Sequence, residues 1–310
     1  MAMKAEMREY LDLLVSKGAP AVYEAPISVI RKNAQGRRAF MGEPEPIHEV
    51  LHRFIAGPTA DLPIRIYRPH PQVKLPVMVW FHGGGFALNY LDLYEQALRS
   101  LANKGQFIIV AVNYQKSPEH PFPVPFDDCF ATLQWVVDNA EEFGFDLSGV
   151  GVGGDSAGAN LAAAVALKAR DTQLIDLAFQ LLIYPCNDLT MNYESARVNG
   201  EGYGLTTKTM EWFIDKYIPK KSELKNPYAS PAYAKDHSHL APAITITAEF
   251  DPLLDDGYNY NVALRKAGNT TIYREFAGQI HGFFIQAGVT EDAEIAQEFV
   301  ANEINALLKR

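Results

Sequence analysis

The sequence is poor in cysteine and has fewer basic than acidic residues. Its 310 residues include two cysteines, Cys129 and Cys186. So few cysteines exclude a disulfide scaffold and indicate a reducing compartment, although one bridge between these two remains open. Lysine and arginine number 28 against 37 aspartates and glutamates, which gives a formal net charge of −9. This acidic balance argues against nucleic acid as the main partner.

Long apolar runs are also missing. No stretch reaches the roughly 18 uncharged apolar residues that a membrane span needs, and near the N-terminus Glu6, Glu9 and Asp12 interrupt what would be the apolar core of a signal peptide. Nor does the sequence hold a His/Cys cluster at metal-ligand spacing or a Gly-x-Gly-x-x-Gly motif opening a βαβ unit. We therefore expect a cytoplasmic protein with no membrane span and no metal site.

A regular alternation of apolar strands and helices runs from residue 75 onward. We predict strands at 75–81, 107–113, 150–153, 178–184, 244–250 and 271–276, and helices at 92–104, 126–143, 157–170, 255–267 and 292–308. Alternation of this kind predicts an α/β fold, in which helices cover both faces of a mostly parallel sheet. Two earlier strands are expected at 47–56 and 62–68, joined by a turn at Gly57-Pro58.

Two regions fall outside this alternation. Apolar residues recur at helical spacing over 3–17, and a second short helix is expected from Ser28. Residues 186–230 are rich in aromatic side chains and interrupt the series of strands and helices. We interpret residues 1–46 and the insertion at about 186–230 as a helical cap over the carboxyl edge of the sheet, where α/β sheets bind ligands. The rest of 47–310 is expected to form one α/β domain.

Residues 154–158, Gly-Asp-Ser-Ala-Gly, match the Gly-x-Ser-x-Gly nucleophile elbow. A serine on a sharp strand-to-helix turn has a strained backbone, and the residues two positions away must lack bulk for the turn to close. A glycine-rich structural loop is the alternative interpretation. The predicted strand before the motif and the alanine-rich helix after it provide the setting that an elbow requires, so we expect Ser156 to be a nucleophile.

His-Gly-Gly-Gly-Phe at 82–86 follows the predicted strand at 75–81. Consecutive glycines leave backbone N–H groups exposed, with no Cβ to obstruct a substrate. Acyl transfer needs such donors near the oxygen that becomes negative, and each is worth about 3–4 kcal/mol of barrier. We predict an oxyanion hole formed by Gly83, Gly84, Gly85 and Ala157, with a flexible turn as the alternative. His82 is expected to brace this loop rather than act as a base.

A nucleophilic serine needs an imidazole to accept its proton and an acid to orient that imidazole. In this type of fold the acid and then the histidine follow the serine in the sequence. His281 is the one histidine beyond residue 239, and Asp251 directly follows the predicted strand at 244–250. The competing acids, Asp255 and Asp256, fall where the next helix starts and are interpreted as capping residues.

Other side chains near these motifs have two interpretations each. Asp155 either orients the elbow or is a solvent-facing or loop-bracing carboxylate, and Glu119 and Glu249 are expected to be solvated or structural carboxylates. Aromatic residues near the motifs are candidates for the substrate pocket, with cap or core packing as the alternative; they are Phe86, Tyr90, Tyr203, Trp212 and Phe283.

Together, these motifs resemble the hormone-sensitive-lipase-like esterases, also called bacterial esterase family IV. The matching segments are His-Gly-Gly-Gly-Phe at 82–86, Ser-Pro-Glu-His-Pro-Phe-Pro at 117–123, Gly-Asp-Ser-Ala-Gly at 154–158, Asp-Pro-Leu at 251–253 and His-Gly-Phe at 281–283. Where the family usually has arginine, this sequence has Gln115 and Leu254. The first change removes an expected salt bridge near the site.

The resemblance implies an α/β-hydrolase fold with a helical cap and no cofactor. It also implies a serine carboxylesterase in which Ser156 is the nucleophile, His281 the base and Asp251 the orienting acid. We expect hydrolysis of short- to medium-chain acyl esters through an acyl-enzyme. An amidase or deacetylase using the same triad is the alternative, whereas a non-catalytic receptor is disfavoured because the triad is complete. The last strand and helix are candidates for pairing in a homodimer.

Overall fold

The computed structural model describes residues 2–18, 20–71 and 74–309. It contains an eight-stranded sheet in the order β1-β2-β4-β3-β5-β6-β7-β8. The strands are β1 Glu49–Ala56, β2 Asp61–Arg68, β3 Leu75–Phe81, β4 Ile108–Val112, β5 Phe145–Asp155, β6 Phe179–Ile183, β7 Ala243–Phe250 and β8 Thr271–Ile280. The pairs β1/β2 and β2/β4 are antiparallel and the other pairs are parallel. The mostly parallel sheet predicted from the sequence is therefore confirmed.

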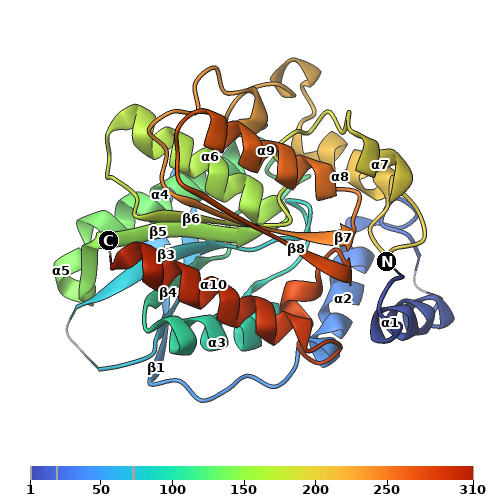
Figure 1. Ribbon diagram of the computed structural model, residues 1–310, viewed down its shortest axis with the longest axis horizontal. Helices are drawn as coiled ribbons and strands as arrows, with labels where there is room; N and C mark the ends of the chain where they lie inside the picture. Colours follow the sequence, from blue (N-terminus) through green and yellow to red (C-terminus); the bar gives the residue numbers. More distant parts are fainter. Residues whose placement is uncertain (1, 19, 72–73, 310) are drawn as a thin grey trace.

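Helices cover both faces of the sheet (Figure 1). The helices are α1 Ala5–Ser16, α2 Ile27–Gln35, α3 Glu95–Gly105, α4 Val124–Asp138, α5 Ala140–Phe143, α6 Ala157–Thr172, α7 Glu194–Val198, α8 Thr207–Tyr217, α9 Leu254–Lys266 and α10 Asp292–Leu308, with 3-10 turns η1 Gly36–Phe40, η2 Leu91–Tyr94, η3 Lys221–Glu223, η4 Pro231–Tyr233 and η5 Phe283–Ile285. Helices α4, α6 and α9 lie on one face, and α3 and α10 on the other. Each face buries its own apolar cluster against these helices, which fixes the strand ends that carry the site.

The two segments that interrupt the sequence pattern lie together in space. Helices α1 and α2 and the insertion with α7 and α8 gather at the end of the molecule reached by the tips of β7 and β8 (Figure 1). A Cβ placed on Gly204 would lie 3.1 Å from Cδ2 of Leu11. The Lys208 ammonium lies 4.0 Å from the centroid of the Tyr23 ring. The N-terminal segment and the insertion thus contact each other across almost two hundred residues of sequence.

Several predicted elements differ from the observed ones at their ends. The predicted helix at 126–143 is two helices, because the backbone of Asn139 (φ −109°, ψ +18°) leaves helical geometry and ends α4, where its side-chain amide donates to the Trp135 carbonyl. Strand β5 begins at Phe145, where it pairs with Leu75, rather than at Val150. Strand β8 continues to Ile280 past a bulge in its pairing with β7. As a result, His281 directly follows the strand.

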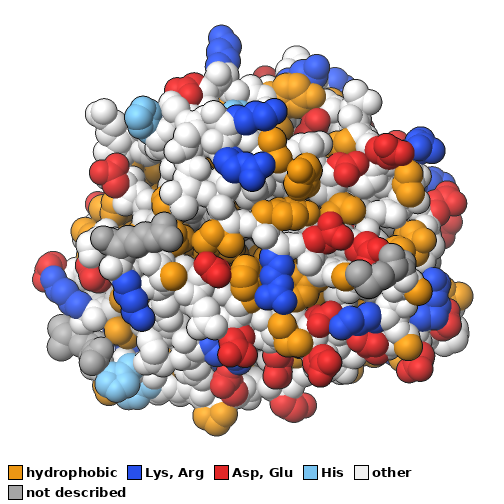
Figure 2. Space-filling view, viewed as in Figure 1, with side chains coloured by type: hydrophobic (Ala, Val, Ile, Leu, Met, Phe, Trp, Pro, Cys, Tyr) orange, Lys and Arg blue, Asp and Glu red, His pale blue; other side chains and the backbone are white. Residues whose placement is uncertain are grey.

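Three further observations concern the surface, the helices and the cysteines. Acidic and basic side chains are interspersed with apolar ones over the face shown in Figure 2. None of the described helices has the length and apolar character needed to cross a membrane. Cys129 and Cys186 are both free and buried, so the bridge left open by the sequence does not form.

Candidate active site

Ser156 occupies a tight turn between β5 and α6. Its φ of +55° and ψ of −121° place a non-glycine residue in a region that costs backbone energy. A Cβ on Gly154 would lie 2.4 Å from the Phe81 carbonyl oxygen, and one on Gly158 only 1.9 Å from the same atom. Both flanking glycines are therefore required for the turn to pack against β3, as the elbow hypothesis predicts.

Three polar side chains meet at the ends of β5, β7 and β8. The Ser156 Oγ lies 2.9 Å from Nε2 of His281, and the opposite ring nitrogen, Nδ1, lies 2.7 Å from Oδ2 of Asp251. The other carboxylate oxygen of Asp251 accepts a hydrogen bond from the Leu253 N–H at 2.8 Å. Asp251 is fully buried, whereas Ser156 is 7% exposed. The geometry is that of a serine–histidine–aspartate triad whose serine is the least buried of the hydroxyl and carboxylate members.

Residues that the sequence did not single out support this arrangement. The ring of Tyr184 lies 4.5 Å from that of His281, centroid to centroid, and Tyr184 itself has a positive φ of +36°. The Asn199 side-chain amide, from the insertion, donates to the backbone carbonyls of Glu249 and Asp251 at 3.0 and 3.2 Å. Neither residue belongs to a sequence motif discussed above, and both act through contacts distant in sequence.

Asp255 and Asp256 bind the insertion and do not reach His281. The Asp255 carboxylate accepts from the Ser195 N–H at 2.7 Å, and that of Asp256 accepts from the Asp188 N–H at 3.0 Å. Burial raises the pKa of Asp256 well above its usual range. Helix α9 has no side-chain cap hydrogen bond at its start. Both residues lie in the first turn of α9, as the sequence predicts, but the carboxylates bond to the insertion rather than capping the helix.

The glycine loop at 83–85 requires a correction to the predicted oxyanion donors. The Gly83 N–H already donates to Oδ1 of Asp155 at 2.8 Å and to the Tyr94 hydroxyl at 2.9 Å. A donor engaged in this way is not free to bind substrate, so the assignment of Gly83 is corrected to a structural one. By contrast, the N–H groups of Gly84, Gly85 and Ala157 donate to no residue in the described part of the chain.

Asp155 braces this loop from inside the protein. Its carboxylate accepts from Gly83 and, at 3.2 Å, from the hydroxyl of Tyr94, which also accepts from the Asn89 amide at 3.3 Å. A Cβ on Gly83 would lie 2.5 Å from Oδ2 of Asp155, so only glycine fits against the carboxylate. Burial raises the pKa of Asp155 to about 6. Of the two roles left open by the sequence, these contacts favour bracing.

His82 is buried in the same region. Its Nδ1 lies 2.8 Å from the Gly83 carbonyl oxygen, and its ring stacks on that of Tyr114 with centroids 4.3 Å apart. The Tyr114 hydroxyl donates to the His82 carbonyl at 2.7 Å. Burial, with the nearby Lys116 ammonium, lowers the pKa of His82 to about 3, so the ring is neutral. These contacts agree with the prediction that His82 supports the loop.

The predicted pocket aromatics have different environments. Phe86 and Phe283 have no exposed surface; Phe86 stacks on Tyr217 with ring centroids 3.7 Å apart. This burial favours the core-packing alternative for both. Tyr203 contacts Phe250, with ring centroids 4.9 Å apart.

Helix α8 brings a different aromatic residue against the glycine loop. Trp212 lies beside Phe213 on α8, with ring centroids 5.4 Å apart. A Cβ on Gly85 would lie 2.2 Å from the Phe213 ring. Phe213, which the sequence interpretation missed in favour of its neighbour, is therefore the residue of this pair that borders the loop.

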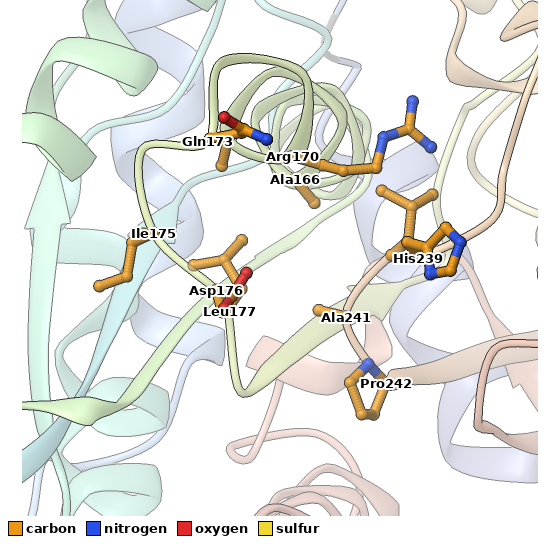
Figure 3. Close-up of a pocket in the computed structure, with 11 residues that line it drawn as sticks. Ala166, Arg170, Gln173, Ile175, Asp176, Leu177, His239, Ala241 and Pro242 are labelled. Atoms are coloured by element: carbon orange, nitrogen blue, oxygen red, sulfur yellow. The ribbon is translucent and has the colours of Figure 1, made fainter.

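A cavity of about 580 Å³ opens at the opposite edge of the sheet, where β6 and β7 begin (Figure 3). Arg170, the arginine of its wall, donates to the carbonyls of Asp236 and Ser238, both at 2.9 Å, and pairs with Asp171. The guanidinium is therefore already satisfied by the protein. Tyr90 lines a separate cavity, described below, and no residue of the Ser156–His281–Asp251 group lines either one.

The site contains two departures from the family motifs. Gln115 stands where an arginine is usual, and its backbone N–H and side-chain amide donate to the Asp128 carboxylate at 2.9 and 3.3 Å. Asp128 is buried, which raises its pKa. Uncharged donors thus take the place of a salt bridge. Leu254 begins α9, and nothing in the structure explains its replacement of arginine.

In the described residues, no three His, Cys, Asp or Glu side chains group as metal ligands.

Comparison with known proteins places these features in a family. A model of the alpha/beta hydrolase fold matches residues 78–285. The carboxylesterase NlhH of Mycobacterium tuberculosis is 39% identical over 229 residues, which cover 72% of this chain and 71% of the relative. The ethyl acetate hydrolase of Pseudomonas putida is 30% identical over 308 residues, covering 95% and 96% of the two chains.

Solved structures agree with the sequence comparison. The hyperthermophilic esterase of the archaeon Pyrobaculum calidifontis superposes with a TM-score of 0.94 at 34% identity, with 99% of each chain covered. The similarity therefore extends over the whole α/β domain and the segments packed on it. The chain belongs to the α/β-hydrolases and, within them, to the hormone-sensitive-lipase-like carboxylesterases, bacterial esterase family IV.

Proposed function

We propose that this carboxylesterase cleaves short- to medium-chain acyl esters through an acyl-enzyme on Ser156. The Ser156 hydroxyl donates its proton to Nε2 of His281 as Oγ attacks the ester carbonyl carbon. The buried Asp251 carboxylate accepts the hydrogen bond from Nδ1–H, which fixes the tautomer and stabilises the imidazolium that forms. The observation that carries this proposal is the continuous contact from Asp251 Oδ2 through His281 to Ser156 Oγ, at 2.7 and 2.9 Å.

Three backbone donors are proposed to stabilise the tetrahedral intermediate. The N–H groups of Gly84, Gly85 and Ala157 are unengaged in the described structure. They belong to the glycine loop and to the start of α6, two segments whose backbones pack together at His82 and Gly158. The intermediate collapses when the imidazolium gives its proton to the leaving alkoxide oxygen. Water then attacks the acyl-enzyme with His281 again as base, and the acid is released. Each donor contributes about 3–4 kcal/mol to lowering the barrier.

Replacing the nucleophile tests this proposal. Ser156→Ala is expected to abolish turnover of p-nitrophenyl butyrate while the protein remains folded, because α6 and the glycines of the turn are unchanged. Far-UV circular dichroism and the melting temperature provide the folding control. Turnover by the alanine variant at a rate close to that of the wild type would contradict the assignment.

A substrate series tests the acyl preference and the alternative chemistry. The p-nitrophenyl esters from C2 to C12 are expected to give the highest kcat/KM at short to medium length. The matching anilide is expected to be cleaved far more slowly than the phenyl ester, since its amine must be protonated to leave. Faster cleavage of the anilide would favour an amidase.

Three further proposals concern the cap, the oligomeric state and the location of the protein. We propose that residues 1–46 and the insertion at about 186–230 together cover the carboxyl edge of the sheet, supported by the Leu11–Gly204 and Lys208–Tyr23 contacts. We also propose a homodimer through β8, which ends the strand order; no described strand pairs with its outer side, although the Lys4 N–H donates to the Gly278 carbonyl near its end. Light scattering is expected to give twice the mass of one chain, and a monomer would contradict the dimer. A cytoplasmic location remains a prediction.

A further inference from the structure

A second cavity, lined by both polar and apolar surface, lies beside the end of the glycine loop. Its volume is about 470 Å³, and its walls come from α2, from Asn89 and Tyr90 and from residues 113–120. Neither the Ser156–His281–Asp251 group nor the three unengaged N–H groups line it. The cavity is therefore separate from the proposed ester site, although it adjoins the loop that completes that site.

The wall of this cavity holds a cation with no acidic partner. The Lys116 Nζ donates to Oδ1 of Asn113 at 2.6 Å and to the Tyr114 carbonyl at 3.2 Å, both uncharged acceptors. Among the described residues, none places a carboxylate within ion-pair distance of this ammonium. Burial and the neighbouring Arg31 guanidinium lower the pKa of Lys116 to about 8, and the weaker opposing effects of Cys129, Asp128 and Glu119 do not offset them. The positive charge is thus poorly compensated by the protein.

The wall also includes Arg31 and His120, and the arginine is already neutralised by a carboxylate. Both terminal nitrogens of Arg31 donate to the Glu119 carboxylate, at 2.8 and 2.7 Å. Lys116, in contrast, uses two of its three N–H donors. The side chain of Gln35, which also lines the cavity, makes no hydrogen bond to another described residue. One ammonium N–H of Lys116 and the amide of the exposed Gln35 therefore have no partner among the described residues, and both can donate to an oxygen anion.

We propose that this cavity binds a small oxyanion, a carboxylate or a phosphate, with the Lys116 ammonium as its counter-ion. The occupant would contact residues connected to the glycine loop. The Asn89 amide donates to the Tyr94 hydroxyl, which accepts from Gly83 and donates to Asp155. Arg31 Nε donates to the Ala87 carbonyl at 2.9 Å. Filling the cavity therefore alters the support of the oxyanion donors and changes kcat.

Thermal unfolding in defined salts tests the binding. The protein is the Ser156→Ala variant, so this measurement does not depend on turnover and remains informative if the proposed function fails. Sodium butyrate and inorganic phosphate are titrated separately against sodium chloride at equal ionic strength. At least one oxyanion is expected to raise Tm saturably, by about 2–5 °C at concentrations well above its Kd. The arm that responds identifies the carboxylate or the phosphate.

Lysine variants locate the site. Lys116→Met is expected to remove the rise, and Lys116→Arg to retain it. Lys168→Met is the matched control, because Lys168 also lies over a tyrosine ring, 5.2 Å from the Tyr228 centroid against 5.6 Å for Lys116 and Tyr114, and does not line the cavity. If the Met variant does not fold, Lys116→Gln replaces it.

The outcomes distinguish anion binding in this cavity from anion binding at the ester site. A rise that persists in Lys116→Met would place the anion elsewhere, for example as a product at Ser156, and would overturn the proposal. No rise beyond that of chloride with either anion would also overturn it. In active enzyme, the same anion is expected to change kcat at least twofold, and this change is expected to disappear in Lys116→Met. An unchanged kcat would overturn the coupling to the glycine loop.

Discussion

The two sides of Ser156 are built in opposite ways. On the His281 side, every polar group in the chain of contacts has a partner: Ser156 Oγ, both ring nitrogens and both carboxylate oxygens of Asp251. On the side of the glycine loop, the N–H groups of Gly84, Gly85 and Ala157 donate to no described residue. The first side is complete before substrate arrives, whereas the second presents donors that substrate must satisfy.

This difference shows where each side obtains its rigidity. Ser156, Asp251 and His281 directly follow or end parallel strands, so the sheet itself fixes their positions. The glycine loop has no side chains of its own to anchor it and is held through Gly83 by Asp155 and Tyr94, and through Ala87 by Arg31. Substitutions on the His281 side should therefore cause large losses of kcat, and substitutions behind the glycine loop should cause smaller ones.

The largest effect is expected from Asp251→Asn. The amide no longer fixes the tautomer of His281, and kcat should fall by about 10⁴-fold by analogy with serine proteases. Steady-state kinetics with p-nitrophenyl butyrate measure the loss. Asp255→Asn is the matched control, because Asp255 binds Ser195 rather than His281. A greater loss in the control would mean that the wrong carboxylate has been identified as the acid.

Gly85→Ala is expected to displace the glycine loop and so to disturb the oxyanion donors. Gly85 has a φ of +60°, and a Cβ there would collide with the Phe213 ring at 2.2 Å, so the loop must shift and its donors must move. We expect kcat to fall by about 10²–10³-fold, the cost of losing one oxyanion donor. Gly18→Ala has a similar φ of +64° with open space around it and controls for backbone strain alone. A Gly85→Ala enzyme with wild-type kcat would remove the glycine loop from the mechanism.

Asp155→Asn tests whether the loop depends on its brace. An asparagine cannot present two anionic oxygens to Gly83 and Tyr94, so we expect kcat to fall about 10-fold, with little change in KM. A roughly 10-fold rise in KM with no change in kcat would indicate that Asp155 supports substrate binding instead.

The same variant has a pH signature. Burial raises the pKa of Asp155 from 3.8 to about 6, so the folded state favours the neutral carboxyl. The associated stabilisation is complete below pH 4 and is lost as pH rises through 6, which costs about 3 kcal/mol. Unfolding by denaturant at pH 4 and pH 7 should therefore show the wild type losing stability relative to Asp155→Asn. A difference that stays constant between these two pH values would contradict the buried-carboxylate account.

The smallest effect is expected from Arg31→Met. This change removes the hydrogen bond to the Ala87 carbonyl and the pair with Glu119, but leaves Gly83 and Asp155 in contact. We expect a kcat about 3- to 10-fold lower. Lys32→Met removes the same charge from an exposed neighbour on α2. Equal kinetics in the two variants would show that α2 does not support the loop.

The sequence predicted the first side of the site much better than the second. Strand β3 and helix α10 have the predicted bounds, and the order of serine, acid and histidine at strand ends was sufficient to select Ser156, Asp251 and His281. These features follow from local patterns and from the way parallel strands align their carboxyl ends.

The supports of the glycine loop are not local. Gly83 meets Asp155 across 72 positions and Arg31 meets Glu119 across 88, and neither pairing leaves a periodic pattern in the sequence. For the same reason, the sequence did not show that the Gly83 N–H is already occupied or that Phe213 lies against Gly85. Which donor is occupied, and which aromatic ring faces the loop, is decided by packing between distant segments.

The nucleophile at the centre of both sides can be trapped directly. Incubation with an organophosphate ester, followed by intact-mass and peptide mass spectrometry, reports which side chain attacks an electrophilic centre. A single adduct on Ser156, absent from Ser156→Ala and formed much more slowly in Asp251→Asn, is the predicted result. An unmodified wild-type chain, or an adduct on another residue, would contradict the proposed mechanism.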